Sequence, residues 1–241
     1  KLRHPWHGKE VGFIGDSITA GVGTNKTYHQ YLSETIGIIN YQQAVSGAQI
    51  SSMLDYAKQL KVSHPDLDAV FLFGGTNDFN NSVPIGDFYT IKQTKTNKNG
   101  QMVTLNQRVI NMDHSTFKGR LNNLASYLKS NFPDSQIIFM TPLHRAFATF
   151  GSTNVQPDET FANTKGLFID DYVQAVREAC NLWSITCIDL YQDSGLYPLD
   201  SNYYKYFANN ETDHLHPNNK GHKRLAKVIA SKLDGIPADF K

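Results

Sequence analysis

The chain has 241 residues, hydrophobic residues make up 40% of it, and its net charge is +1 at pH 7. This apolar content excludes a disordered chain, and a near-zero charge without a basic run excludes nucleic acid or an anionic membrane surface as the main partner. No stretch approaches the 18 or so consecutive apolar residues that span a membrane, so we expect no membrane span. We predict a single domain over 1–241 with an insertion at about 79–113.

The chain begins at Lys1 and not at a methionine. We expect a tag remnant, a signal peptide or an upstream domain to have preceded it, which favours a secreted or cell-surface location over a cytoplasmic one. Its two cysteines, Cys180 and Cys187, are too few for a disulfide framework and lack a metal-ligand spacing. Two buried thiols are favoured over a disulfide, so the cysteines do not fix the compartment.

After a polar lead-in from Lys1 to Glu10, a short apolar strand is predicted over residues 10–15. Gly15 lets the backbone turn sharply, and Ser17 follows just past the carboxyl end of the strand, where open α/β sheets place their ligands. A helix is expected next, and its free N–H groups favour negative charge near Ser17. This stretch alone leaves two interpretations open: a nucleophilic serine, or a serine that only caps the helix.

The next elements alternate between helix and strand. Apolar residues at helical spacing predict a helix that begins at Tyr28 and ends at Gly37. Residues 38–41 indicate a second strand, which leads into the loop that carries Gly47. A second helix follows over 50–64, because its apolar residues fall on one face.

The uniformly apolar run 69–73 is typical of a central parallel strand, and it leads directly to Asn77. The insertion that follows has no helical stripe. Asn99-Gly100 lies between β-prone runs and predicts a hairpin. Because the insertion begins beside Asn77, we expect the hairpin to form a wall of the pocket for the alcohol part of a substrate.

The remaining elements complete the alternation. They are a helix over 117–128, a strand over 137–140, a loop over 146–160, a helix over 168–179, a strand over 185–190, and a last helix over 225–233. Alternating strands and helices imply a parallel sheet with helices on both faces. We predict an α/β protein: a three-layer α/β/α sandwich around a five-stranded parallel sheet, with a hairpin-like insertion after the third strand.

Ser17, Gly47 and Asn77 follow successive strands, so a parallel sheet brings them to one edge. His216, in the loop before the last helix, is a candidate base for Ser17, and Asp213 is placed to hold its other ring nitrogen. The N–H groups of Ser17 and Gly47 and the amide of Asn77 are candidate donors to an oxyanion. A serine nucleophile, a histidine base and donors to an oxyanion are the groups that acyl transfer requires.

Four blocks of the sequence resemble, in order, those of the SGNH hydrolase superfamily, also called GDSL esterases or lipases. The blocks are Gly15-Asp16-Ser17-Ile18, Gly47, Gly75-Thr76-Asn77-Asp78 and Asp213-His214-Leu215-His216. The resemblance implies a flavodoxin-like sandwich and a serine hydrolase without cofactor. It does not imply a substrate, because members cleave acyl esters, acetylated sugars, thioesters and lysophospholipids.

Parts of the sequence also resemble two other kinds of site. Asp213, His214 and His216 are ligand types that suit zinc, but no further ligand cluster lies close in sequence, and His222 falls inside the last helix. The glycine-rich loop after the first strand resembles a phosphate cradle, but it lacks the P-loop lysine. We therefore expect neither a metal nor a cofactor.

Several residues near the catalytic blocks are candidate substrate contacts. They are Asp16, Asp78, Phe79, His144 and Arg145. For Arg145, pairing with a carboxylate of a neighbouring loop is an equal alternative. His214 is expected to be structural, and packing is favoured over a sugar platform for Tyr203, Tyr204 and Tyr206.

The sequence thus predicts a serine ester hydrolase that forms an acyl-enzyme on a small soluble ester. A carbohydrate O-acetyl ester is the first choice of substrate, and a short-chain acyl ester or a lysophospholipid is the alternative. The rival from another class is a carbohydrate-binding or interaction module on the same fold.

Overall fold

The computed structural model describes residues 3–241, and Lys1 and Leu2, where the expected lead-in begins, lie outside the described residues. Its main sheet has five parallel strands in the order β2-β1-β3-β6-β9. They are β1 (Glu10–Gly15), β2 (Ile39–Ala44), β3 (Ala69–Phe73), β6 (Gln136–Met140) and β9 (Thr186–Ile188). This order is that of flavodoxin-like folds and confirms the predicted fold class.

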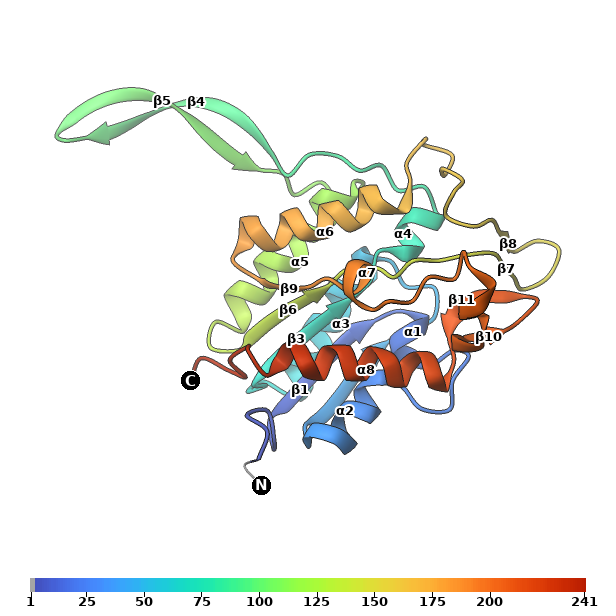
Figure 1. Cartoon of the computed structure of the whole chain (residues 1–241). Coiled ribbons are helices and arrows are strands. Elements are labelled where there is room, and N and C mark those ends of the chain that lie inside the picture. The colour runs from blue at the N-terminus through green and yellow to red at the C-terminus, as the bar shows by residue number, and fades with distance from the viewer. Residues whose placement is uncertain (1–2) are drawn as a thin grey trace.

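Helices cover both faces of this sheet (Figure 1). On one face lie α3 (Ile50–Ser63), α5 (Phe117–Asn131) and α6 (Ile169–Trp183), and on the other lie α2 (Tyr28–Ile36) and α8 (Asn219–Leu233). Successive side chains of a strand point to opposite faces: Val70 and Leu72 of β3 join the first core, and Phe71 joins the second. The buried central strand is therefore apolar throughout.

Local sequence fixes where the main helices begin. The Thr27 side chain caps α2 in a capping box with Gln30. Thr116 Oγ1 accepts from Gly119 N at 3.2 Å at the start of α5, and Asn218 Oδ1 accepts from Gly221 N at 3.1 Å at the start of α8. These caps satisfy backbone N–H groups of the first turn and fix the residue at which each helix begins.

The structure differs from the predicted elements in the loops. The second strand extends to Ala44, and the fifth ends at Ile188 because Asp189 caps a short helix, α7 (Leu190–Asp193). The two segments expected to be loops pair as a small antiparallel sheet in the order β10-β11-β7-β8. Its strands are β7 (Ala148–Thr149), β8 (Val155–Gln156), β10 (Phe207–Asn209) and β11 (Asp213–Pro217), and a 3₁₀ helix, η1 (Ser201–Tyr206), precedes β10. These strands are too short to show an alternating pattern in the sequence.

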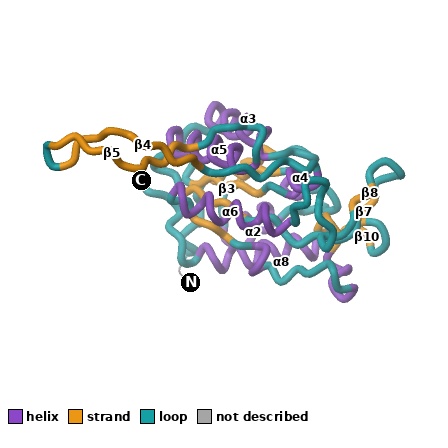
Figure 2. Tube along the Cα trace, turned by 90° about the horizontal axis from the view of Figure 1, so that it is seen from above, coloured by secondary structure: helices purple, strands orange, loops and turns teal. Residues whose placement is uncertain are grey.

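The insertion forms the expected hairpin, with β4 (Tyr89–Lys98) paired antiparallel to β5 (Gln101–Ile110). Asn99 and Gly100 both have positive φ, 55° and 80°, as a two-residue type I′ turn requires. We call residues 89–110 the arm. Figure 1 shows it projecting from the body on the side away from α1 (Ser17–Ala20), the helix that begins with Ser17. Figure 2 shows it at the end of the molecule opposite β7, β8 and β10.

The expectation that the hairpin walls the substrate pocket is therefore wrong. Between α4 (Thr76–Asn80) and the arm, the chain is anchored by the buried side chains of Val83 and Phe88, which pack into the core beside α5 and α6. This connection carries the root of the arm away from Asn77. The sequence shows where an insertion begins but not the direction in which its connection runs.

Replacing residues 92–104 with a short Gly-Ser turn is consequently expected to change kcat/KM by less than about threefold, for a small ester and for a bulky ester alike. The physical reason is that the arm projects away from Ser17 at the start of α1 (Figure 1). Parallel kinetics with p-nitrophenyl acetate and an acetylated polysaccharide check this. A loss confined to the bulky substrate would restore the specificity role.

Two further expectations concern membranes and cysteines. Over residues 3–241, no helix is long and apolar enough to cross a membrane. Cys180, on α6, is buried and Cys187, on β9, is partly buried; both are free thiols.

Candidate active site

The site begins at the carboxyl end of β1, where the strand order reverses and open α/β sheets bind ligands. A Cβ at Gly15 would lie 2.3 Å from Thr19 Oγ1, so only glycine fits this turn. Ser17 is the first residue of α1, and Asp16 Oδ1 accepts a hydrogen bond from Ile18 N at 3.0 Å. Asp16 thus supplies the cap, and the Ser17 side chain is left for another partner.

That partner is His216. Its Nε2 lies 3.0 Å from Ser17 Oγ, and its Nδ1 lies 2.8 Å from Asp213 Oδ2. With Nδ1–H donating to the carboxylate, Nε2 is the acceptor for the serine hydroxyl. The structure brings the three side chains together, in the arrangement that a nucleophile, its base and a group that orients the base require.

Asp213 is held in the ionised state. Burial would raise its pKa, but the hydrogen bond and charge of His216, together with the backbone N–H groups of Leu215 and His216, hold the pKa below its ordinary value of 3.8. Both backbone groups donate to Oδ1 at 3.0 Å. An ionised Asp213 can stabilise the imidazolium that forms when His216 takes a proton.

His216 lies on a strand and not in the expected loop. β11 pairs with β10 and, at Asp213, with Ala148 of β7. From the opposite side, Gly23 packs so close that a Cβ there would lie 3.2 Å from His216 Cβ. The small sheet therefore fixes the histidine over the end of β1, although the two segments are far apart in the sequence.

The candidate oxyanion donors lie on neighbouring loops. Asn77 Nδ2 donates to Ala48 O at 2.9 Å, which ties the asparagine to the loop of Gly47 and leaves its second amide hydrogen free. Gly47 has a φ of +81°, a conformation that favours glycine. Within residues 3–241, no hydrogen-bond acceptor is assigned to the N–H of Ser17 or Gly47.

The side chains of Asp78 and Asp16 are buried and accept hydrogen bonds from within the protein. Asp78 accepts from Ile50 N at 3.1 Å and from Arg120 Nη1 at 2.9 Å, which joins α3, α4 and α5. Burial raises the pKa of each carboxyl to about 6. Their hydrogen bonds make them supports of the loops, and the expected contact with substrate stays a prediction.

The raised pKa of Asp16 gives a prediction about stability. Protonated Asp16 stabilises the fold below pH about 4, and this contribution is lost as the pH rises through the folded pKa of about 6. In Asp16→Asn the side chain stays neutral at every pH. The melting temperature of the variant relative to the unmodified protein should therefore rise between pH 4 and pH 7. A constant difference across this range would contradict the pKa shift.

Phe79, His144 and Arg145 make supporting contacts around the site, and their expected contact with substrate stays a prediction. Phe79 is buried against Tyr172, with ring centroids 5.8 Å apart. Arg145 is buried above the Phe79 ring, and its Nη1 donates to Thr76 Oγ1 at 2.8 Å; burial lowers its pKa to about 10. Among residues 3–241 the Arg145 guanidinium bonds Thr76 and Gln156 and forms no ion pair with a carboxylate, so it braces neighbouring loops without the expected pairing.

The carboxylate near Arg145 is Glu159. Glu159 Oε2 accepts a hydrogen bond from the backbone N–H of Arg145 at 2.8 Å. The other carboxylate oxygen, Oε1, is hydrogen-bonded to His144 Nδ1. The His144 ring also stacks on the Tyr191 ring, with centroids 3.6 Å apart. His144 thus belongs to the support behind the site, although it remains partly exposed.

His214 makes structural contacts on the same strand as His216. Its Nε2 is hydrogen-bonded to the backbone oxygen of Asn210 at 2.7 Å. Its ring stacks on the Tyr204 ring, with centroids 3.7 Å apart. This stacking assigns Tyr204 to packing. In the described part of the chain, no group of three or more His, Cys, Asp or Glu side chains is placed to hold a metal ion.

Phe150 is the residue that the sequence did not single out. Its ring lies edge-on to the ring of His216, with centroids 5.4 Å apart, and the side chain remains 45% exposed. It sits at the turn between β7 and β8, in a segment without periodicity. The only feature of the sequence that indicated a role for Phe150 was its place next to Gly151 in a predicted loop, which is a weak signal.

Comparison with known proteins agrees with this geometry. The model of the GDSL-like lipase/acylhydrolase family matches residues 13–224. A search of curated protein sequences finds no match. A crystal structure of a protein from Lactobacillus plantarum is similar with a TM-score of 0.74 at 26% identity, covering 98% of this chain and 99% of that one.

Two further solved structures share the fold. A possible lipase from Chitinophaga pinensis has a TM-score of 0.70 at 19% identity, over 94% of this chain and 98% of that one. The acetyl xylan esterase AlAXEase has a TM-score of 0.59 at 17% identity, over 92% and 98% of the two chains.

Proposed function

This chain belongs to the GDSL-like lipase/acylhydrolase family, a family of hydrolases, and we propose that it is a serine esterase that works through an acyl-enzyme on Ser17. One observation carries the proposal: the continuous hydrogen-bonded chain from Ser17 Oγ through His216 to Asp213. A serine hydroxyl is a weak nucleophile until a positioned base accepts its proton.

In the first half-reaction, Ser17 Oγ attacks the ester carbonyl carbon while its proton passes to His216 Nε2. Asp213 stabilises the imidazolium that results. The negative charge on the former carbonyl oxygen is stabilised by the N–H groups of Ser17 and Gly47 and by the amide of Asn77. The intermediate collapses, the C–O bond to the alcohol breaks, and His216 returns the proton to the departing alcohol oxygen.

In the second half-reaction, His216 takes a proton from water, whose oxygen attacks the acyl carbon of the Ser17 ester. The second tetrahedral intermediate uses the same three donors. When it collapses, the carboxylic acid leaves and Ser17 Oγ regains its proton from His216. The catalytic cycle therefore needs one ester and one water, and no redox partner.

For the substrate we propose an ester with a small acyl group, with a carbohydrate O-acetyl ester first. Asp16 and Ile18, the residues on either side of Ser17, border a small cavity of about 10 Å³, which is room for one water. Phe150 offers a flat apolar surface for the alcohol part next to His216. A structure similar to this fold belongs to an acetyl xylan esterase.

The test is a panel of p-nitrophenyl esters of increasing acyl length, together with acetylated xylan and a lysophospholipid. We expect kcat/KM to be highest for acetate and to fall as the acyl chain lengthens, and we expect acetate release from the polysaccharide. A preference for long chains or for the lysophospholipid would contradict the small acyl site. Absence of turnover on every ester would favour the non-enzyme module.

A further inference from the structure

The site has two halves that come from different parts of the chain. The proposed oxyanion donor Asn77 lies on α4, which follows β3 of the main sheet. The proposed base His216 lies on β11 of the small antiparallel sheet. In acyl transfer the amide must face the oxygen of the carbonyl that Ser17 attacks while His216 takes the serine proton. The relative position of the two halves therefore decides the geometry of the site.

One side chain, that of Arg145, bonds to both halves. Its Nη1 donates to Thr76 Oγ1 at 2.8 Å and to Thr76 O at 3.2 Å, directly before Asn77 in the sequence. Its Nη2 donates to Gln156 Oε1. Gln156 belongs to β8, whose partner β7 is paired with β11 at Asp213. The guanidinium thus links the residue next to the oxyanion donor with the sheet that carries the base.

The interior position of this guanidinium costs free energy of folding. Arg145 is 2% exposed, and in the described part of the chain no carboxylate lies within ion-pair distance of its guanidinium. Burying a charge destabilises the fold unless hydrogen bonds offset the cost. The bonds to Thr76 and Gln156 supply part of the offset, and the Phe79 ring, 5.3 Å from Cζ, supplies another part. A costly charge that is bonded to both halves of the site indicates a role in function.

Asn77 depends on other elements for its position. Its bond to Ala48 O ties the amide to the loop of Gly47, which carries another proposed donor to the oxyanion. Helix α4 has only five residues, and no side chain caps its first turn, so it is not stable by itself. Asp78 ties α4 to α3 and α5. Arg145 ties the same short helix in the other direction, toward the small sheet.

We propose that Arg145 is a positioning residue that sets the distance between the Asn77 amide and the pair Ser17–His216. It acts through its bonds to the α4 and β8 side chains, and the inference rests on the proposed function. Arginine suits this role because its planar group carries N–H donors in a fixed fork that can hold two separate acceptors. A lysine carries the same charge, but all its donors are on one nitrogen.

The kinetic test is a double-mutant cycle on p-nitrophenyl acetate. Arg145→Lys keeps the charge and loses the fork, and it should lower kcat by about tenfold or more with KM nearly unchanged, because a misplaced catalytic group slows the chemical step. In an Asn77→Ala background the same substitution should lower kcat by less than about threefold, since the amide that it positions is absent. Equal losses in the two backgrounds would overturn the proposal.

The two acceptors provide variants that leave Arg145 in place. Thr76→Val and Gln156→Leu each remove one acceptor and should each lower kcat by about fivefold, whereas Thr76→Ser and Gln156→Glu keep an acceptor and should stay within about twofold of the unmodified protein. Asn154→Ala removes the other bond of the Gln156 side chain, at 3.0 Å, and should also stay within about twofold. Losses that do not follow the presence of the acceptor would contradict the role of Arg145.

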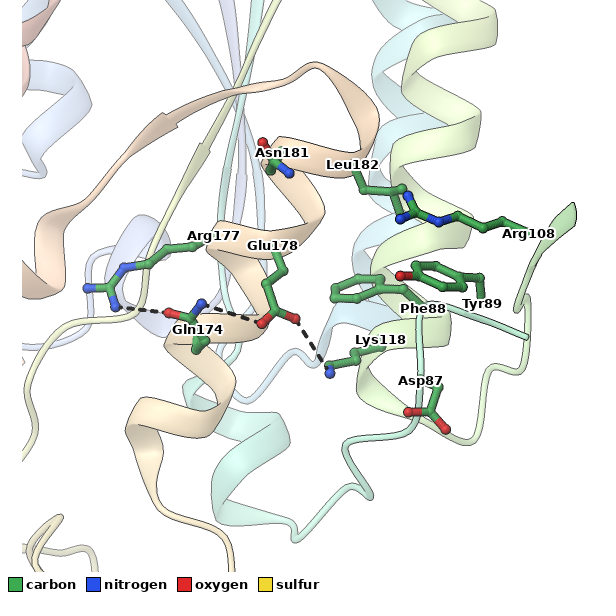
Figure 3. A pocket seen from close by; sticks show the side chains of 10 residues that line it. All are labelled: Asp87, Phe88, Tyr89, Arg108, Lys118, Gln174, Arg177, Glu178, Asn181 and Leu182. Carbon is green, nitrogen blue, oxygen red and sulfur yellow. Dashed lines mark hydrogen bonds and ion pairs between the residues drawn. The ribbon is translucent and has the colours of Figure 1, made fainter. Parts of the chain in front are cut away.

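A matched control for the loss of the fork is Arg177→Lys on α6. Arg177 also holds two acceptors, Asp189 at 2.7 Å and Gln174 at 3.4 Å. Figure 3 shows it at the edge of a hollow of about 760 Å³ beside the root of the arm, and none of the residues that line this hollow is a proposed catalytic residue. Arg177→Lys should therefore keep kcat within about twofold. A loss as large as that of Arg145→Lys would show a general effect of replacing arginine and would overturn the proposal.

A readout that does not use ester hydrolysis is the mobility of the Asn77 side-chain amide, measured by ¹⁵N relaxation and identified by its loss in Asn77→Ala. We expect an ordered amide in the unmodified protein and a more mobile one in Arg145→Lys and Gln156→Leu, with thermal melting to establish that each variant folds. If Arg145→Lys does not fold, Gln156→Leu carries the test, since its side chain is only partly buried.

An Asn77 amide that is equally ordered in the unmodified protein and in the folded variants would overturn the proposal. An unmodified protein that hydrolyses no ester would defeat the proposed function, while the relaxation data would still decide whether Arg145 positions Asn77. The two failures are therefore distinguishable.

Discussion

Ser17→Ala and His216→Ala should each lower kcat by about 10⁴ or more, and the double variant should be little worse than either single variant. The reason is that the hydroxyl and the imidazole act in one proton-coupled step, across the 3.0 Å between Ser17 Oγ and His216 Nε2. Steady-state kinetics on p-nitrophenyl acetate with all three variants measure this. Losses that add in the double variant would mean that the residues do not share a step.

The control for the histidine lies two residues away on the same strand. His214 bonds Asn210 O and stacks on Tyr204, so His214→Ala should keep most of the activity, although it loses these packing contacts. Thermal melting separates a loss of fold from a loss of chemistry. If His214→Ala were as inactive as His216→Ala while folded, the wrong histidine would have been assigned as the base.

Asn77→Ala should lower kcat by about 10² to 10³, or about 2.7–4 kcal/mol, with KM nearly unchanged. The amide is held by its bond to Ala48 O at 2.9 Å, so its remaining hydrogen is oriented before the substrate arrives. A donor that acts on the oxyanion stabilises the transition state more than the ground state. The effect should therefore appear in kcat.

The matched control is Asn81→Ala, one turn later on the same helical segment, whose exposed amide donates to Asn77 O at 2.8 Å. It should keep kcat within about threefold. An effect of Asn77→Ala on KM alone would show that this amide binds the ground state. Equal losses of kcat in the two variants would show that any disturbance of this helical segment lowers activity. The Asn77 amide would then not be needed as a donor to the oxyanion.

Much of the fold could be predicted from the sequence, because its strongest signals come from burial. The run 69–73 is apolar throughout since β3 has a core on each face. The Asn99-Gly100 turn was predictable because the two positive φ angles that it needs are costly for most residues. The convergence of Ser17, Gly47 and Asn77 followed from the parallel sheet alone.

Other features depend on contacts between distant segments and leave no local pattern. β11 pairs with the two-residue strand β7, so His216 appeared to lie in a loop. Arg145 and Asp78 follow strands, as catalytic residues often do, but they turn inward to Thr76 and Arg120. The direction of the arm depends on where Phe88 is anchored, which the sequence does not reveal.

The most direct test of the mechanism is labelling with a fluorophosphonate, read by intact mass and peptide mapping. The probe requires a serine activated by its base, so it tests the pair Ser17–His216 independently of the natural substrate. We predict one adduct per chain, on Ser17, with labelling abolished in Ser17→Ala and strongly slowed in His216→Ala. An unlabelled protein, an adduct on another residue, or equal labelling of the His216→Ala variant would contradict the assignment of Ser17 as the activated nucleophile.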